Sequence, residues 1–78
     1  MNWRDHIHSD PGILGGKPVV KGTRISVELI LEYMTDGATV ADIIDGLPSV
    51  TEADIRAAIA FSNHLMSKEA VSARREAA

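Results

Sequence analysis

The sequence predicts a mainly helical domain in which three helices follow a small amino-terminal β-hairpin. The spacing of apolar residues changes at Ser26, from alternation typical of strands to a period of about 3.6 typical of helices. Beyond that point three stretches each begin with a helix-capping residue, and the first two end at a glycine. We therefore expect one helix-turn-helix-like domain over residues 1–66, with its β element first, and a short helical or disordered tail over 67–78.

The amino-terminal third consists of short apolar pieces separated by glycine and proline. Alternation over residues 3–9 predicts a strand with Trp3 and Ile7 on one face. Residues 19–25 hold two β-branched pieces joined by Lys21-Gly22, and a two-residue link with glycine second favours a tight turn. We expect a small hairpin over residues 19–25.

Two short helices are predicted next. The first has Ser26 as its N-cap, apolar residues at helical spacing, and Gly37 at the position just past its end. The second starts at Thr39, and Asp42 stands three residues later, which is the arrangement of a capping box. Pro48 prevents the second helix from continuing because proline lacks a backbone N–H.

A third, longer helix is predicted from Thr51, because Asp54 stands three residues later and completes a second capping-box pattern. The short second helix, the turn at 47–49 and the longer third helix resemble a helix-turn-helix. Together with the first helix they match the three-helix core of homeodomain-like domains. This arrangement by itself does not determine a function.

Composition excludes several classes of protein. The chain has 78 residues and no cysteine, so disulfides and thiolate metal sites are excluded. No apolar run approaches the ~20 residues that span a bilayer, and the polar start is unlike a secretory signal. We expect a soluble, cytoplasmic protein without membrane association.

The net charge of −3 is unevenly distributed. Residues 1–25 carry four Lys or Arg and two Asp, whereas residues 26–66 carry one Arg and seven Asp or Glu. Residues 67–78 carry three basic and two acidic side chains. The distribution fits either ordinary surface variation or opposite ends that meet different partners.

No motif for catalysis or for a cofactor is present. A phosphate-binding loop would need glycine where Pro11 stands and a hydroxyl residue where Pro18 stands. His6 and His8 supply two imidazoles on one face of a strand, but zinc takes three or four ligands, so solvent-facing histidines are expected instead. The acidic residues around the second turn are explained mostly by helix capping. We expect a protein that is not an enzyme and that holds no metal or cofactor.

Nucleic-acid binding has mixed support. The third helix begins with acidic side chains, and Arg56 is the main basic residue near its start. Lys17, Lys21 and Arg24 surround the predicted hairpin and are candidates for phosphate contacts, with a solvated basic turn as the alternative. If DNA is bound through these four residues, a dimer must supply enough contacts.

The run DPGILGGKPVVKGTRISV at residues 10–27 resembles the signature of domain-of-unknown-function family 433. The similarity continues through Gly37 and Thr39, a short helix ending in Leu-Pro, and the run TEADIRAA from Thr51. It covers about residues 6–63. Leu47 stands where an aromatic residue is expected before Pro48.

The resemblance implies a homeodomain-like or winged-helix-like fold with an amino-terminal β element, often dimeric. It further implies an antitoxin of the VapB-like kind, which pairs with a PIN-like ribonuclease toxin. Such antitoxins bind their toxin and, as a complex, their own promoter. We therefore expect a nuclease toxin, a second copy of the chain and DNA as partners.

Two groups of side chains are candidates for toxin binding. Arg74 and Arg75 are candidates to compete for the metal-binding acids of a nuclease. Phe61, Leu65 and Met66 are candidates for a hydrophobic anchor, if they are exposed.

Two other functions remain open on the sequence. A stand-alone DNA-binding regulator would bind DNA without a toxin, in a salt-sensitive way that depends on Lys21 and Arg24. A structural dimerisation module would pair its amino-terminal strands across a two-fold axis, with Trp3 and Ile7 buried only in the dimer.

Overall fold

A computed structural model describes the backbone of residues 1–77 and the side chains as far as Ser67. Three α-helices follow a two-stranded antiparallel sheet, so the predicted mainly helical fold is confirmed. The elements in chain order are the 3-10 helix η1 (Trp3–Asp5), β1 (Ile7–His8), the 3-10 helix η2 (Leu14–Gly16), β2 (Val19–Val20), α1 (Val27–Thr35), α2 (Val40–Gly46) and α3 (Glu52–Ala77).

The ends of α1 follow from local chemistry. The Ser26 hydroxyl accepts a hydrogen bond from the Leu29 N–H at 3.0 Å, which satisfies one of the free donors of the first turn. At the other end Gly37 has a φ of +90°, a conformation that glycine adopts without steric cost. The Ala38 N–H then donates to the Tyr33 carbonyl at 3.0 Å, closing a Schellman motif. Both predicted ends are confirmed.

Capping boxes start both α2 and α3. The Asp42 N–H donates to the Thr39 hydroxyl at 3.1 Å, and the Thr39 N–H donates to the Asp42 carboxylate at 2.9 Å. The same reciprocal pair joins Thr51 and Asp54, at 3.1 and 3.0 Å. The two predicted helix starts are therefore confirmed.

The amino-terminal β element differs from the prediction. Residues 3–5 form a 3-10 helix instead of a strand, and β1 pairs with β2 in the register Ile7–Val20 and His8–Val19. The expected hairpin over residues 19–25 is reduced to one bridge between Val19 and Ser26. The chain turns at Gly22, whose φ is +78°, and α1 already begins at Val27, so only a short stretch is left to pair with β2. The partner strand of β2 therefore comes from a more distant part of the sequence.

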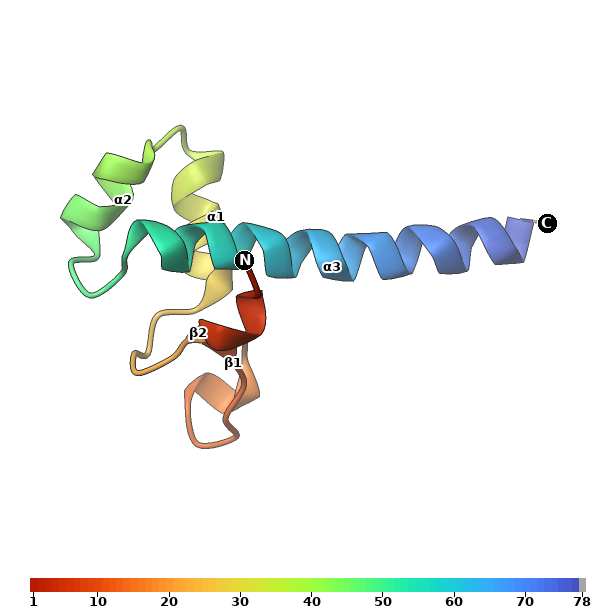
Figure 1. Ribbon diagram of the computed structural model, residues 1–78, viewed down its shortest axis with the longest axis horizontal. Helices are drawn as coiled ribbons and strands as arrows, with labels where there is room; N and C mark the ends of the chain where they lie inside the picture. Colours follow the sequence, from red (N-terminus) through yellow and green to blue (C-terminus); the bar gives the residue numbers. More distant parts are fainter. Residues whose placement is uncertain (78) are drawn as a thin grey trace.

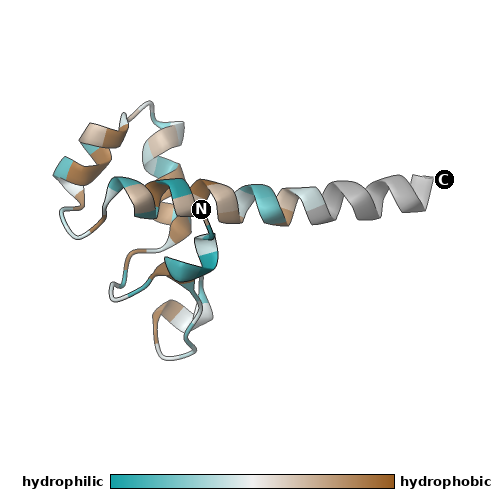
Figure 2. Ribbon diagram, in the orientation of Figure 1, coloured by the Kyte–Doolittle hydropathy of each residue, from teal (hydrophilic) through white to brown (hydrophobic). Residues whose placement is uncertain are grey.

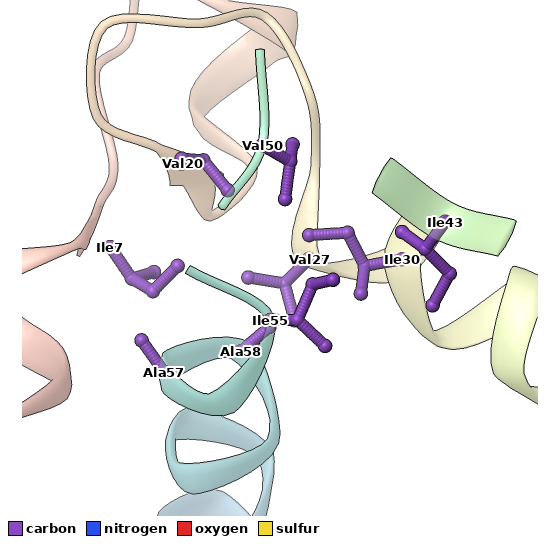
Figure 3. Close-up of a cluster of buried hydrophobic side chains, with 9 residues drawn as sticks. All are labelled: Ile7, Val20, Val27, Ile30, Ile43, Val50, Ile55, Ala57 and Ala58. Atoms are coloured by element: carbon purple, nitrogen blue, oxygen red, sulfur yellow. The ribbon is translucent and has the colours of Figure 1, made fainter. Parts of the chain in front are cut away.

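The core lies where α1, α2 and the first turns of α3 meet the sheet (Figure 3). Ile30 of α1, Ile43 of α2 and Ile55 of α3 are fully buried. Each such side chain stabilises the fold by roughly 1.5–3 kcal/mol relative to an exposed one. The remaining buried members of the cluster are Ile7, Val20, Val27, Val50, Ala57 and Ala58.

Helix α3 extends well beyond this core (Figure 1). Its first half packs against η1, β1, α1 and α2, and its second half points away from them, so the molecule measures 46 × 30 × 22 Å. Figure 2 shows apolar residues concentrated where the helices converge. Over the part of the chain described, no helix is both long and apolar enough to cross a membrane.

Candidate functional site

The four basic residues predicted for DNA binding do not form one patch. Lys17 pairs with Glu28 at 3.2 Å, and Arg56 pairs with Glu52 one turn earlier on α3 at 2.7 Å. Both pairs are exposed, so they contribute little to stability, but they place a carboxylate beside each cation.

Lys21 and Arg24 are exposed and make no ion pair among the side chains described as far as Ser67. Arg24 and Lys17 border a hollow of about 390 Å³ that Glu28 and Glu32 also line. Arg56 borders a different hollow, beside Met1 and Glu52. Lys17 and Arg24 therefore share one hollow with two acidic side chains, and Arg56 lies at a different one.

Trp3 and Ile7 pack inside a single chain. Ile7 is only 3% exposed and belongs to the core, so the expectation that it is buried only in a dimer is wrong. Trp3 stacks edge-on against Phe61 of α3, with ring centroids 4.9 Å apart, and also contacts His64. The Arg4 guanidinium covers the Trp3 ring at 4.4 Å. These contacts attach η1 to α3, which accounts for both apolar residues without a second copy.

His6 joins the amino-terminal segment to the start of α3. Its Nδ1 lies 2.9 Å from the Asp54 carboxylate, and the Asp54 side chain is only 14% exposed. Partial burial raises the pKa of Asp54, but hydrogen bonds from Thr51 and His6 outweigh it and leave that pKa below its ordinary value. The prediction of solvent-facing histidines is therefore wrong for His6.

His8 does not combine with His6 into a metal site. The Nε2 atom of His8 is buried and has no hydrogen-bond partner. Among residues 1–67, where side chains are described, no group of three or more His, Asp or Glu side chains is placed to hold a metal ion. The carboxylate beside His6 instead serves to hold two segments together.

An apolar groove runs between α1 and α3, with a volume of about 350 Å³. This size lies at the lower end of the roughly 300–1,000 Å³ range of protein ligand sites. Two of the residues predicted to bind a partner, Phe61 and Leu65, line it, and Leu65 is 46% exposed. Met66 is 64% exposed but does not line the groove.

The wall of the groove on α1 was missed by the sequence reasoning. Val27 and Leu31 contribute apolar surface, while Glu28 and Glu32 stand at the edge. The available signal was that α1 is apolar over more than one face, because Ile30 already fills the core and Leu31 is adjacent to it in sequence. The side chains of Arg74 and Arg75, also predicted to bind a partner, lie outside the described residues.

Comparison with known proteins gives one family and two relatives. The sequence profile of the protein family of unknown function DUF433 matches residues 7–62. The uncharacterized protein y4eO of Sinorhizobium fredii is 36% identical over 59 residues, which are 76% of this chain and 27% of that protein. The chain therefore spans about a quarter of the length of this relative.

A solved structure shows the same fold. The crystal structure of a DUF433 member protein from Anabaena variabilis superimposes with a TM-score of 0.75 at 26% identity, over 83% of this chain and 64% of that one. The matched region includes the glycine- and lysine-rich run before α1 and all the capping residues described above. On the extent of the profile match, the chain belongs to the DUF433 family.

Proposed function

We propose that this chain is the antitoxin of a type II toxin–antitoxin pair, which binds and inhibits a PIN-like ribonuclease and, as a dimer in complex with it, binds its own promoter. The observation that carries the proposal is the groove between α1 and α3, in which Phe61 and Leu65 present apolar surface to solvent. Partly exposed aromatic and aliphatic side chains in a hollow are typical anchors for a protein partner.

The rest of the site also favours binding over catalysis. The Asp42 and Asp54 carboxylates are engaged in capping boxes, and His6 is held by Asp54. These groups therefore already have structural roles, and none of them lines the groove. The proposed role is inhibition by occupancy of a partner's surface.

Co-expression with the protein encoded by the neighbouring reading frame tests the proposal. Affinity purification of a tagged antitoxin chain is expected to recover a stoichiometric complex, and the complex is expected to cleave RNA more slowly than the free nuclease. Leu65→Ser is the variant that tests the role of the groove. Met66→Ser is its matched control, because both side chains are exposed but only Leu65 lines the groove. Recovery of the tagged chain alone would refute the proposal.

A second candidate, a stand-alone DNA-binding regulator, has one observation in its favour. Lys21 and Arg24 are both exposed, and among the described side chains neither makes an ion pair. Against it, Glu52 neutralises Arg56 at the start of α3, where a helix-turn-helix contacts bases. This function predicts salt-sensitive binding of upstream DNA by the chain alone, reduced by Lys21→Ala or Arg24→Ala. Binding that needs the nuclease as well favours the antitoxin.

A further inference from the structure

The groove between α1 and α3 has an acidic edge beside its apolar floor. Glu28 and Glu32 stand one helical turn apart on α1, and both line the groove together with Phe61, Leu31 and Leu65. Glu28 is neutralised by Lys17, at 3.2 Å. Glu32 makes no ion pair among residues 1–67, so its carboxylate faces solvent at the edge of an apolar surface.

Acidic side chains outnumber basic ones in the groove and along its helices. Lys17 is the one basic residue beside the two glutamates in its lining, and Arg24 borders the adjacent hollow. Residues 26–66, which include α1, α2 and most of the described part of α3, carry seven acidic side chains and one basic one. That Arg56 is paired with Glu52. With Glu28 neutralised by Lys17, the carboxylate left to attract a basic partner is that of Glu32, supported by the excess of acidic side chains on the helices.

We infer that the groove binds a basic amphipathic segment of a protein partner, whose apolar side chains lie against Phe61, Leu31 and Leu65 while a Lys or Arg at its border meets Glu32. Two observations point to this occupant: the groove has an apolar floor between two helices, and its edge carries an unpaired carboxylate. Helices that dock into such grooves present apolar residues along one face. Nucleic acid is disfavoured because its phosphates would meet the same carboxylates.

The inference rests on the proposed function and makes it more specific. A ribonuclease must hold the phosphates of RNA with Lys and Arg, so its substrate-binding surface is basic. An acidic groove on an inhibitor is complementary to a basic segment of that surface. The charge thus specifies which part of a nuclease the groove would cover.

The test uses a synthetic helical peptide of about 18 residues, built from Leu and Lys at amphipathic spacing, and its counterpart with Glu in place of Lys. The full chain, labelled with ¹⁵N, is titrated with each peptide. The Leu/Lys peptide is expected to shift the amide signals of Leu31, Phe61 and Leu65, and the Leu/Glu peptide is expected to bind at least tenfold more weakly. Equal binding of the two peptides, or shifts confined to other residues, would overturn the inference.

Two pairs of exposed variants separate the groove from general charge and hydrophobicity. Glu32→Lys is expected to weaken peptide binding roughly fivefold, whereas Asp45→Lys, which changes the net charge equally on α2, is expected to leave it within twofold. Leu65→Ser is likewise expected to weaken peptide binding roughly fivefold, whereas Met66→Ser is expected to have little effect on it. Equal effects within either pair contradict the inference. Circular dichroism confirms that each variant is folded.

The two proposals fail in different ways. A nuclease complex that forms but is unaffected by Glu32→Lys and Leu65→Ser removes this inference and leaves the antitoxin function standing. If the chain binds the Leu/Lys peptide selectively but forms no nuclease complex, the antitoxin function is refuted and the groove's preference for basic amphipathic segments stands. If sedimentation shows a dimer of the free chain that Leu65→Ser dissociates and Met66→Ser does not, the groove is occupied by a second copy and the inference is wrong.

Discussion

Replacement of Asp54 by alanine is expected to destabilise this domain more than an ordinary capping substitution. The Asp54 carboxylate accepts a hydrogen bond from the Thr51 N–H at 3.0 Å and also lies 2.9 Å from Nδ1 of His6, which is 48 positions away in the sequence. One side chain therefore both starts α3 and attaches the amino-terminal segment to it. Alanine removes both interactions and leaves the His6 ring without its carboxylate partner.

The magnitude follows from these two interactions. Loss of a capping interaction costs about 1 kcal/mol, and loss of a partly buried hydrogen bond to a charged group costs about 1–2 kcal/mol more. Together they reduce the free energy of unfolding by roughly 2–3 kcal/mol. In a domain of this size that corresponds to a fall in melting temperature of roughly 10–20 °C.

The matched control is Asp42→Ala. Asp42 occupies the same position in the capping box of α2, but it is exposed and makes no contact with a histidine among the described side chains. Urea unfolding followed by circular dichroism at pH 7 is expected to show a clearly larger loss for Asp54→Ala. In a double-mutant cycle, His6→Ala is expected to remove most of the difference. Equal losses for the two aspartates would show that the His6 contact contributes nothing, and would refute the reasoning.

The pH dependence of Asp54→Ala has a definite sign. The pKa of Asp54 is lower in the folded chain than its ordinary value of 3.8, so the folded state favours the ionised carboxylate. Its contribution to stability is fully present above about pH 4 and is lost as the pH falls through the lowered pKa. The stabilities of wild type and Asp54→Ala are therefore expected to converge as the pH falls below 3.8 and through the lowered pKa of Asp54. A stability difference that does not shrink as the pH falls below 3.8 contradicts this account.

Three further substitutions probe the packing that supports the groove. Ile30→Ala removes a fully buried side chain and is expected to cost about 2–5 kcal/mol in urea unfolding, whereas Ile30→Val costs about 1 kcal/mol; equal costs would argue against tight packing there. Gly37→Ala forces a φ of +90° on alanine and is expected to lower stability by about 1 kcal/mol, so an unchanged melting temperature would contradict the assigned turn. Trp3→Ala removes the edge-on contact with Phe61 and is expected to lower the free energy of unfolding by about 1–3 kcal/mol, followed by circular dichroism. An unchanged free energy of unfolding would show that η1 is not attached to α3 in solution.

Features that depend on neighbouring residues were predicted best. Ser26, Thr39 and Thr51 each satisfy a free N–H of their own helix, and Gly37 ends α1, so the helix boundaries follow from chemistry within a few residues. The prediction for the amino-terminal segment was less successful. Alternation over residues 3–9 is typical of a strand. In the structure the Trp3 ring packs against Phe61 of α3, and residues 3–5 form a short 3-10 helix instead.

Of the two helices that form the groove, only the residues on α3 were predicted from the sequence. Phe61 and Leu65 were named, together with Met66, as a hydrophobic anchor on the condition that they are exposed. Their partners Leu31 and Glu32 were not, because α1 is long enough to cover the core with one face and to line the groove with another. Which face meets α3 depends on the angle at which the two helices cross, and no local pattern reports that angle.

The sequence by itself determined the number of helices, their starts and the family, because caps, glycines and a long contiguous motif act over short distances along the chain. The tertiary structure alone decided that β1 pairs with β2, that His6 meets Asp54 and that α1 and α3 leave an apolar groove with an acidic edge. Each of these joins residues that are many positions apart. Their proximity depends on how the whole core packs, since the same side chains would satisfy local rules equally well in other arrangements.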